Sequence, residues 1–318
     1  MTSVNKRIPF FRIIISLLFL ILLAGLLASC VQAPRFRVVG YAIAGINVGA
    51  IQFEKVTHIN YAFLTPNKDG TFAPIGNPVE LREIVEKAHA KGVKVLISVG
   101  GWGWNDKFEA LAEDPISRTM FVNGLAKFID QFKLDGADID WEFPILGKSS
   151  DNFLALMQEL HKALPNKLLT SAVVAFGSTG EGIPSSAFEL FDFVNIMAYD
   201  GGGPNHSPYE LAEEAVRYWL GRGLPATKAV LGVPFYSRPI YGPYWKIVLK
   251  DPNAAYVDEL KILSTVINYN GIPTIQKKTE LALNQASGIM IWALNYDSVD
   301  DTSLLSTIYR TIQEYQQP

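Results

Sequence analysis

Eight short apolar segments alternate with longer amphipathic segments along most of the chain, and this alternation constrains the fold more than any other feature. The short segments are rich in β-branched and aromatic residues, as strands are: 37–43, 56–64, 93–99, 136–142, 168–175, 191–198, 229–235 and 288–294. Helical spacing of apolar residues is found between and after them, at 78–91, 115–132, 150–164, 207–222, 273–285 and 302–315. This alternation indicates a parallel sheet whose crossover connections are helices.

Length and composition favour a single domain. The chain has 318 residues, 49% of them hydrophobic, and α/β barrels of this size commonly form one domain. We therefore predict an α/β fold, a closed (β/α)8 TIM barrel spanning residues 37–318. With 28 basic against 31 acidic residues, and without zinc-type Cys/His spacing or a phosphate-binding glycine loop, the sequence argues against nucleic-acid partners and against a metal or nucleotide cofactor.

Three carboxylates alternate with apolar residues in the segment LDGADIDWEFP at 134–144. In a strand, Asp138, Asp140 and Glu142 project to the same side. Like charges on a partly buried surface repel, and lost hydration disfavours ionisation, so at least one acid should hold a proton near neutral pH. The alternatives are a solvated edge strand or a hard-cation site, but the apolar neighbours favour burial, where unpaired acids are costly. The pattern therefore predicts an acid catalyst.

Polar and aromatic residues gather where the predicted strands end: Tyr41, Ser98, Trp102, Glu142, Tyr199, Asp200, Tyr236, Arg238 and Trp292. Barrel enzymes place their active sites at the C-terminal ends of the strands, so we expect these side chains to share one mouth. Each of them alone also fits an ordinary core or turn position. Together they favour a sugar site, because sugars stack their C–H faces on aromatic rings while their hydroxyls form hydrogen bonds.

The N-terminal segment has the pattern of an export signal. Three basic residues precede the apolar run 13–27, and small residues then lead to Cys30, the only cysteine. The tetrapeptide LASC resembles the lipobox of bacterial lipoproteins, which implies a signal peptide at 1–29, lipidation of Cys30, and an anchor or linker at 30–36. An uncleaved membrane anchor is the alternative, although the run is shorter than the ~20 residues of a spanning helix. We expect an exported protein, lipid-anchored to the outer face of a bacterial membrane in the cell envelope.

Five motifs resemble those of the family 18 glycoside hydrolases, the chitinases. The family's DGxDxDWEYP, SxGG, MxYD, GVPFYGR and closing-strand motifs are matched by DGADIDWEFP at 135–144, SVGG at 98–101, MAYD at 197–200, GVPFYSR at 232–238 and GIMIW at 288–292. They occur in family order and on the strands where the barrel requires them. The resemblance extends from about residue 38 to residue 296.

The resemblance implies a retaining mechanism in which the substrate's own acetamido oxygen is the nucleophile. In that mechanism Glu142 donates a proton to the glycosidic oxygen and then acts as base. Asp140 orients the acetamido N–H and shares a proton with Asp138, while Tyr199 holds the acetamido carbonyl. The substrate-binding positions that the resemblance implies are Tyr41, Ser98, Trp102, Asp200, Tyr236, Arg238 and Trp292, the last as the floor beneath the sugar. No metal or other cofactor is implied.

The expected activity is hydrolysis of β-1,4-linked N-acetylglucosamine chains, as in chitin and chitooligosaccharides. The alternatives are an endo-β-N-acetylglucosaminidase acting on the core of N-glycans, and a non-catalytic glycan-binding lectin on the same fold. About fifty residues with one predicted helix separate Tyr236 from Gly288, so we expect no large α+β insertion domain. His206 lies in a predicted loop, and we expect it to be a solvated surface residue.

Overall fold

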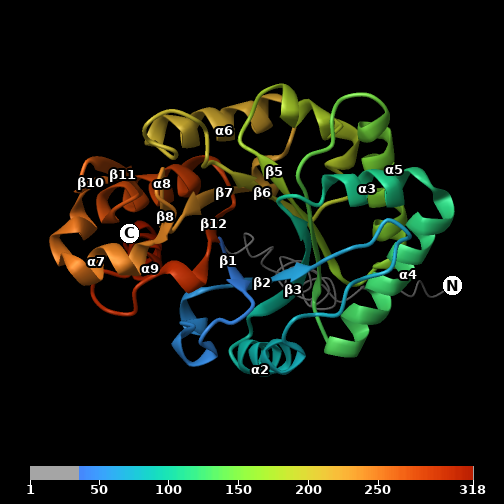
Figure 1. Cartoon of the computed structure of the whole chain (residues 1–318), viewed down its shortest axis with the longest axis horizontal. Coiled ribbons are helices and arrows are strands. Elements are labelled where there is room, and N and C mark those ends of the chain that lie inside the picture. The colour runs from blue at the N-terminus through green and yellow to red at the C-terminus, as the bar shows by residue number, and fades with distance from the viewer. Residues whose placement is uncertain (1–35, 318) are drawn as a thin grey trace, which may run out of the picture. The chain divides into compact units, whose positions relative to one another are not determined.

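The computed structural model describes residues 36–317, and it confirms the predicted (β/α)8 barrel. Eight parallel strands close in the order β1-β12-β7-β6-β5-β4-β3-β2, which Figure 1 shows nearly end on. Their bounds lie within three residues of the predicted ones: β1 Arg37–Ile43, β2 His58–Leu64, β3 Lys94–Gly101, β4 Gly136–Trp141, β5 Leu168–Val174, β6 Phe193–Met197, β7 Ala229–Pro234 and β12 Gly288–Trp292.

Helices surround the barrel (Figure 1). The predicted ones are confirmed as α2 Pro78–His89, α4 Pro115–Phe132, α5 Lys148–Ala163, α6 Tyr209–Gly221, α8 Ile272–Gln285 and α9 Leu304–Tyr315. Two helices were not predicted, α3 Asn105–Glu113 and α7 Tyr244–Lys250. Among residues 36–317, no helix is both long and apolar enough to cross a membrane.

Local sequence explains where the helices begin. The side chains of Asn77, Asp114 and Ser303 accept hydrogen bonds from the first turns of α2, α4 and α9, which satisfies N–H groups that lack partners within a helix. Proline follows the first two of these caps, where its missing N–H costs nothing. By contrast, α3 and α7 have no side-chain cap. Their starts therefore carry no such signal in the sequence.

Two apolar layers hold the barrel together. One lies between the strands and the helices, and the other fills the barrel interior with Val39, Tyr41, Ala62, Phe193, Val230, Met290 and Ala293. All six residues of β7 are buried, as expected for a parallel strand covered on both faces. Gly136 has a specific reason to be glycine, since a Cβ there would lie 2.0 Å from the Leu168 carbonyl oxygen of the neighbouring strand.

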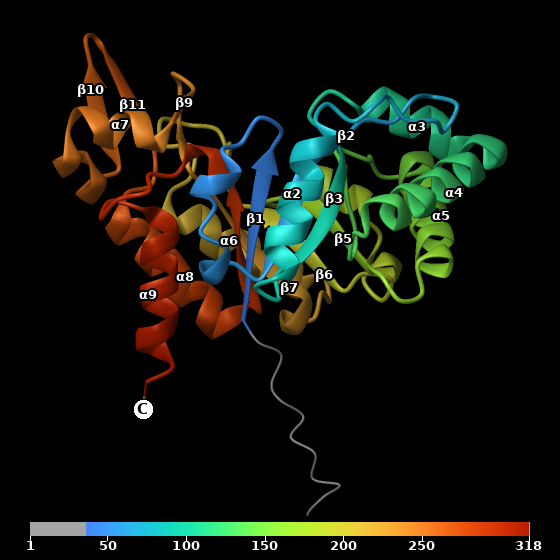
Figure 2. The same cartoon turned by 90° about the horizontal axis from the view of Figure 1, so that it is seen from below.

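The connection from β7 to β12 is richer than the single helix expected there. It contains α7, α8, and two short hairpins, β8 Tyr236–Ser237 with β9 Gly242–Pro243 and β10 Glu259–Ile262 with β11 Thr265–Asn268. Figure 2 shows α7 and the β10–β11 hairpin at the end of the barrel toward which β1 points. No large insertion domain is present between residues 36 and 317. The predicted signal peptide at 1–29 and the anchor at Cys30 lie outside the described residues.

Candidate active site

Strand β4 carries the acids into the barrel mouth. It pairs in register with β3, so that Asp138 lies beside Ser98 and Asp140 beside Gly100. Asp138 and Asp140 are 0% and 3% exposed, and Glu142 follows the end of the strand. Gly100 permits this close pairing, because a Cβ there would lie 2.4 Å from the Asp140 carbonyl oxygen. The three acids therefore lie at successive depths, with Asp138 deepest.

Asp138 is surrounded by hydrogen-bond donors. Oδ2 accepts from the Tyr41 hydroxyl at 2.6 Å and the Ser98 hydroxyl at 2.9 Å, and Oδ1 accepts from the Thr170 hydroxyl at 2.6 Å and Asn195 Nδ2 at 3.1 Å. Burial raises the pKa of Asp138, while these four hydrogen bonds act in the opposite direction. All four donors come from other strands of the barrel. The structure therefore builds a fixed polar cradle around this carboxyl.

Asp140 and Glu142 are the acids that take up protons most readily. Burial, followed by the charges of Glu142 and Asp138, raises the pKa of Asp140 well above its ordinary value. Burial, followed by the charge of Asp200, raises the pKa of Glu142 to about 7. Within residues 36–317, the buried Asp140 Oδ1 has no hydrogen-bond partner. The mouth thus holds a carboxyl protonated near neutral pH beside a carboxyl oxygen that is free to accept a hydrogen bond.

A second polar group lies after β6. Asp200 accepts from Arg238 Nε at 3.0 Å and Nη2 at 2.8 Å, and His206 Nδ1 lies 3.1 Å from Asp200 Oδ1. Although burial raises the pKa of Asp200, hydrogen bonds from His206, Arg238 and Tyr236 hold it well below the ordinary value. Burial also raises the pKa of Tyr199 well above its usual range. Asp200 is therefore a fixed anion, and the Tyr199 phenol stays a hydrogen-bond donor.

The expectation that His206 is solvated is wrong. His206 is 3% exposed, and its second nitrogen, Nε2, lies 3.2 Å from the Tyr236 carbonyl oxygen. Both ring nitrogens face acceptors, so the imidazole bridges Asp200 to the strand end at Tyr236. The loop that contains His206 folds back because the Gly201 N–H donates to the His206 carbonyl at 3.1 Å. Sequence reasoning missed this because position in a loop was taken to mean exposure.

Aromatic rings complete the mouth. The Trp292 ring stacks on Phe63 with centroids 5.6 Å apart and lies tilted against Tyr41 at 5.4 Å, while Trp102 is 80% exposed at the rim. They help enclose a cavity of about 630 Å³. Nine predicted residues line this cavity: Tyr41, Trp102, Asp140, Glu142, Tyr199, Asp200, Tyr236, Arg238 and Trp292. Ser98 and Asp138 are not among its lining residues, and both are 0% exposed.

Several residues of the site were not predicted. Phe63 and Tyr241 line the cavity, and Thr170 and Asn195 donate to Asp138. Thr170 and Asn195 could have been found, because each is a polar residue inside a mostly apolar strand, where burial without a partner is costly. Tyr241 carries no such signal. It belongs to the turn between β8 and β9, which brings it beside Tyr236 with ring centroids 4.9 Å apart.

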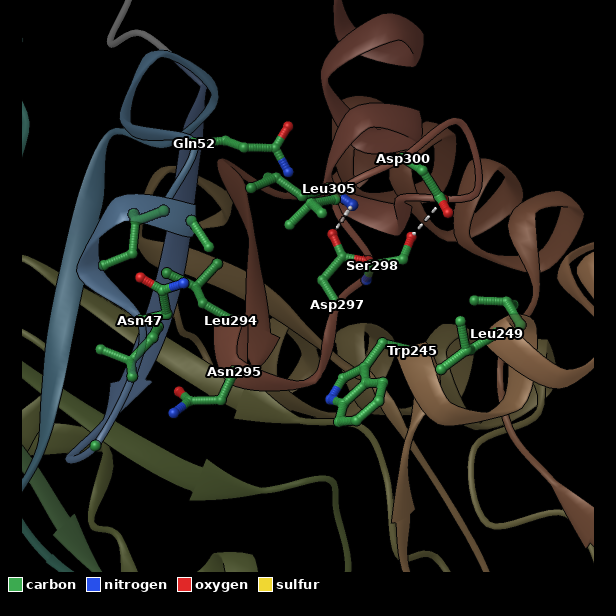
Figure 3. A pocket seen from close by; sticks show the side chains of 16 residues that line it. Asn47, Gln52, Trp245, Leu249, Leu294, Asn295, Asp297, Ser298, Asp300 and Leu305 are labelled. Atoms are coloured by element: carbon green, nitrogen blue, oxygen red, sulfur yellow. Dashed lines mark hydrogen bonds between the residues drawn. The ribbon is translucent and has the colours of Figure 1, made fainter.

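A second cavity, of about 440 Å³, lies between the loop after β1, helix α7 and the segment before α9. Figure 3 shows its lining side chains, with Asp297 directed toward Leu305. Asp297 accepts the N–H groups of Ser298, Leu304 and Leu305 and the Ser303 hydroxyl. This acid is therefore occupied in holding the start of α9. Among the described residues, no group of three or more His, Cys, Asp or Glu side chains is arranged to hold a metal ion.

Comparison with known proteins identifies the family. Residues 37–297 match the sequence model of the glycosyl hydrolases family 18. A chitinase-like effector of Moniliophthora roreri is 31% identical over 229 residues, covering 62% of this chain and 56% of that protein. A class V chitinase of Lotus japonicus is 27% identical over 327 residues, covering 80% of this chain and 81% of that protein. The chain spans 56% or less of the length of the first curated relatives that it matches.

Solved structures agree with this assignment. The family 18 chitinase ChiB from the chitin utilization locus of Flavobacterium johnsoniae is 32% identical, with a TM-score of 0.79 and coverage of 89% of this chain and 96% of that one. A chitinase from Bacteroides thetaiotaomicron is 28% identical, with a TM-score of 0.80 and coverage of 89% and 99%. The chain belongs to the glycosyl hydrolases family 18 and is a chitinase-like glycoside hydrolase.

Proposed function

We propose that the protein hydrolyses β-1,4-linked N-acetylglucosamine chains with retention of configuration, using the substrate's acetamido oxygen as the nucleophile. One observation carries this proposal: Glu142 lines the cavity, and its pKa is raised to about 7, so that it can give up and take back a proton near neutral pH. Asp138 is enclosed by four donors, and Asp200 is paired with Arg238 and His206. Burial, followed by the charges of Glu142 and Asp138, raises the pKa of Asp140 and so disfavours a free carboxylate there. Because none of these acids is an ionised carboxylate free to attack the sugar, the attacking atom is best supplied by the substrate.

In the first step, the proton of Glu142 moves to the glycosidic oxygen. The bond from that oxygen to C1 breaks as the acetamido oxygen bonds to C1 on the opposite face, which gives an oxazolinium ion. Asp140 Oδ1 accepts the acetamido N–H, and the Tyr199 hydroxyl donates to the acetamido oxygen, which places it for attack. The Trp292 ring supports the apolar face of the sugar.

In the second step, Glu142, now a carboxylate, removes a proton from water. The water oxygen attacks C1 from the side that the leaving group vacated, and the oxazolinium ring opens to restore the acetamido group. Two inversions at C1 give net retention. A pKa of about 7 suits both halves of this cycle, because the same group must first release and then take up a proton near neutral pH.

The same chemistry also fits an endo-β-N-acetylglucosaminidase acting on the N-glycan core. Hydrolysis of chitin-type chains is preferred because the relatives and solved structures that match this chain are named chitinases. A non-catalytic lectin is disfavoured because a binding protein has no use for a protonated Glu142 at the cavity wall. Product analysis on N-acetylglucosamine oligomers beside an N-glycopeptide decides between the two substrates. Glu142→Gln should abolish cleavage while leaving oligomer binding, and cleavage at the wild-type rate would overturn the proposal.

We also propose that Cys30 is lipidated after removal of residues 1–29, and that the barrel of residues 37–318 is thereby held outside the cytoplasm at the bacterial envelope. The support is the basic leader, the apolar run and the LASC tetrapeptide. Labelled fatty acid should enter the wild-type protein during expression in bacteria and should be absent from Cys30→Ser. Equal labelling of the two would contradict the assignment.

A further inference from the structure

Lys278 is a fully buried lysine that has no role in the mechanism above. It lies in α8 and is 0% exposed. Its Nζ donates to the Ser207 carbonyl at 2.7 Å, the Ser207 hydroxyl at 2.7 Å and Asn270 Oδ1 at 2.8 Å. These three acceptors use all three donors of an ammonium group. Burial of a charge against neutral partners costs free energy. If the site had only a structural task, we would expect a neutral residue there.

The first connection runs from Lys278 to the loop after β6. The Ser207 hydroxyl donates to the Ala198 carbonyl at 2.7 Å, and Ala198 directly precedes Tyr199. Ser207 directly follows His206, whose ring contacts Asp200. Lys278 therefore holds Ser207, the residue through which the end of this loop is bonded to Ala198 at its beginning.

The second connection runs through Asn270. Asn270 Nδ2 donates to the Ser207 carbonyl at 2.8 Å, so the amide bridges the loop to the chain that follows β11. Two residues earlier, Asn268 exchanges both backbone hydrogen bonds with Arg238, at 2.9 and 2.7 Å. His206 and Arg238 both contact Asp200, and both are therefore connected to the segment that Lys278 binds.

We propose that Lys278 is a positioning residue that acts through Ser207 and Asn270 to hold Tyr199 and Asp200 in place against Glu142. This inference rests on the proposed function, because it assigns Lys278 to the same reaction. Lys278 itself touches neither the cavity nor its lining acids. Its influence on the reaction is therefore entirely through the loop.

The loop affects the acid through charge. The groups that face Glu142 are Asp140 from β4, Tyr199 and Asp200 from the end of β6, and Arg238 from the end of β7, paired with Asp200. Burial raises the pKa of Glu142, and the charge of Asp200 raises it further. If the loop loosens, Asp200 moves away and water enters, so both causes weaken and the pKa of Glu142 falls. Burial lowers the pKa of Lys278 to about 7, and the charges of Asp258 and Glu210 act in the opposite direction.

The test variant is Lys278→Met, which keeps an unbranched side chain one heavy atom shorter than that of lysine and removes the three hydrogen bonds. We expect kcat on an N-acetylglucosamine oligomer to fall about 10-fold or more with little change in KM, because small misplacements of positioning groups impair the chemical step. The basic limb of the pH–rate profile should move downward by roughly one pH unit. Ser207→Ala removes only the hydroxyl connection, so it should shift both quantities in the same direction by less. This milder variant keeps the test decisive if Lys278→Met does not fold.

The matched control is Thr279→Val. Thr279 is the next residue of α8 and is equally buried, but its hydroxyl donates only to the Ile275 carbonyl of its own helix. This variant should leave kcat and the pH profile unchanged, while the free energy of unfolding measured in urea should fall. If it reproduces the effects of Lys278→Met, or if folded Lys278→Met and Ser207→Ala both keep wild-type kcat and pH profile, the proposal is wrong.

A measurement without substrate separates this inference from the proposed function. Protein labelled with ¹³C at the Glu side-chain carboxyl gives an NMR titration of Glu142, assigned by difference from Glu142→Gln. The Glu142 signal should titrate at lower pH in Lys278→Met than in the wild type. If the Glu142 titration is lowered but the protein cleaves no N-acetylglucosamine chain, the positioning role of Lys278 stands and the proposed hydrolase function is wrong. An unchanged titration in an active enzyme would reject the positioning role alone.

Discussion

Replacing Thr170 by Val tests whether the donors around Asp138 control the charge of the acids in the mouth. The Thr170 hydroxyl lies 2.6 Å from Asp138 Oδ1, and Val has nearly the same shape without the donor. A hydrogen bond to a charged group contributes about 1.5–3 kcal/mol, and about 1.4 kcal/mol corresponds to one pH unit. Loss of this donor disfavours the charged form of the Asp138–Asp140 pair. The acid limb of the pH–rate profile should therefore move upward by roughly one to two pH units.

The assay is kcat/KM for a fluorogenic N-acetylglucosamine oligomer as a function of pH. Ser171→Ala is the matched control, because Ser171 is the next residue of β5, is also buried, and donates to the Ile139 carbonyl rather than to an acid. Its pH profile should keep the wild-type acid limb. An unmoved acid limb in Thr170→Val, or an equal shift in Ser171→Ala, would refute the reasoning.

Two further predictions follow from the geometry. Asp200→Asn removes the charge that is, next to burial, the main cause of the raised pKa of Glu142. The basic limb of the pH–rate profile should therefore move to lower pH. An unchanged or raised limb in the same assay would contradict this. Gly136→Ala places a methyl group 2.0 Å from the Leu168 carbonyl oxygen and should lower the free energy of unfolding by roughly 1–3 kcal/mol or more. Gly76→Ala, whose added Cβ would meet nothing within 4 Å, is the control in urea denaturation, and equal stability of the two variants would count against the close packing of β4 and β5.

Most of the barrel could be predicted because its strands are apolar runs and its main helices repeat apolar residues at helical spacing, three of them after a side-chain cap. Asn77, Asp114 and Ser303 mark helix starts in sequence as they do in the structure. Helices α3 and α7 and the β10–β11 hairpin were missed because they are short, with 9 and 7 residues in the helices and 4 in each strand, and lie in segments without a clear period. Their placement depends on contacts with distant parts of the chain, as in the pairing of Arg238 with Asn268.

Nine residues that line the mouth could be predicted, but Phe63, Tyr241 and the groups that support the acids could not. The alternation of Asp138, Asp140 and Glu142 follows from strand geometry alone. Which acid is buried deepest depends on partners from four other strands, namely Tyr41, Ser98, Thr170 and Asn195. The same limit applies to His206, which packs against Tyr236, and to Lys278, which joins α8 to the loop at Ser207. Local sequence says little about such pairings.

The most direct test of the central claim is whether cleavage requires the acetamido group of the substrate. Oligomers of N-acetylglucosamine and oligomers of glucose with the same linkage should be compared, with a stable thiazoline analogue of the oxazolinium ion as inhibitor. The account predicts that glucose oligomers are nearly inert, that the thiazoline inhibits, and that Asp140→Ala weakens this inhibition, because catalysis depends on binding the developing bicyclic state best. Efficient cleavage of glucose oligomers, or a covalent sugar ester trapped on Asp140 or Glu142, would contradict it.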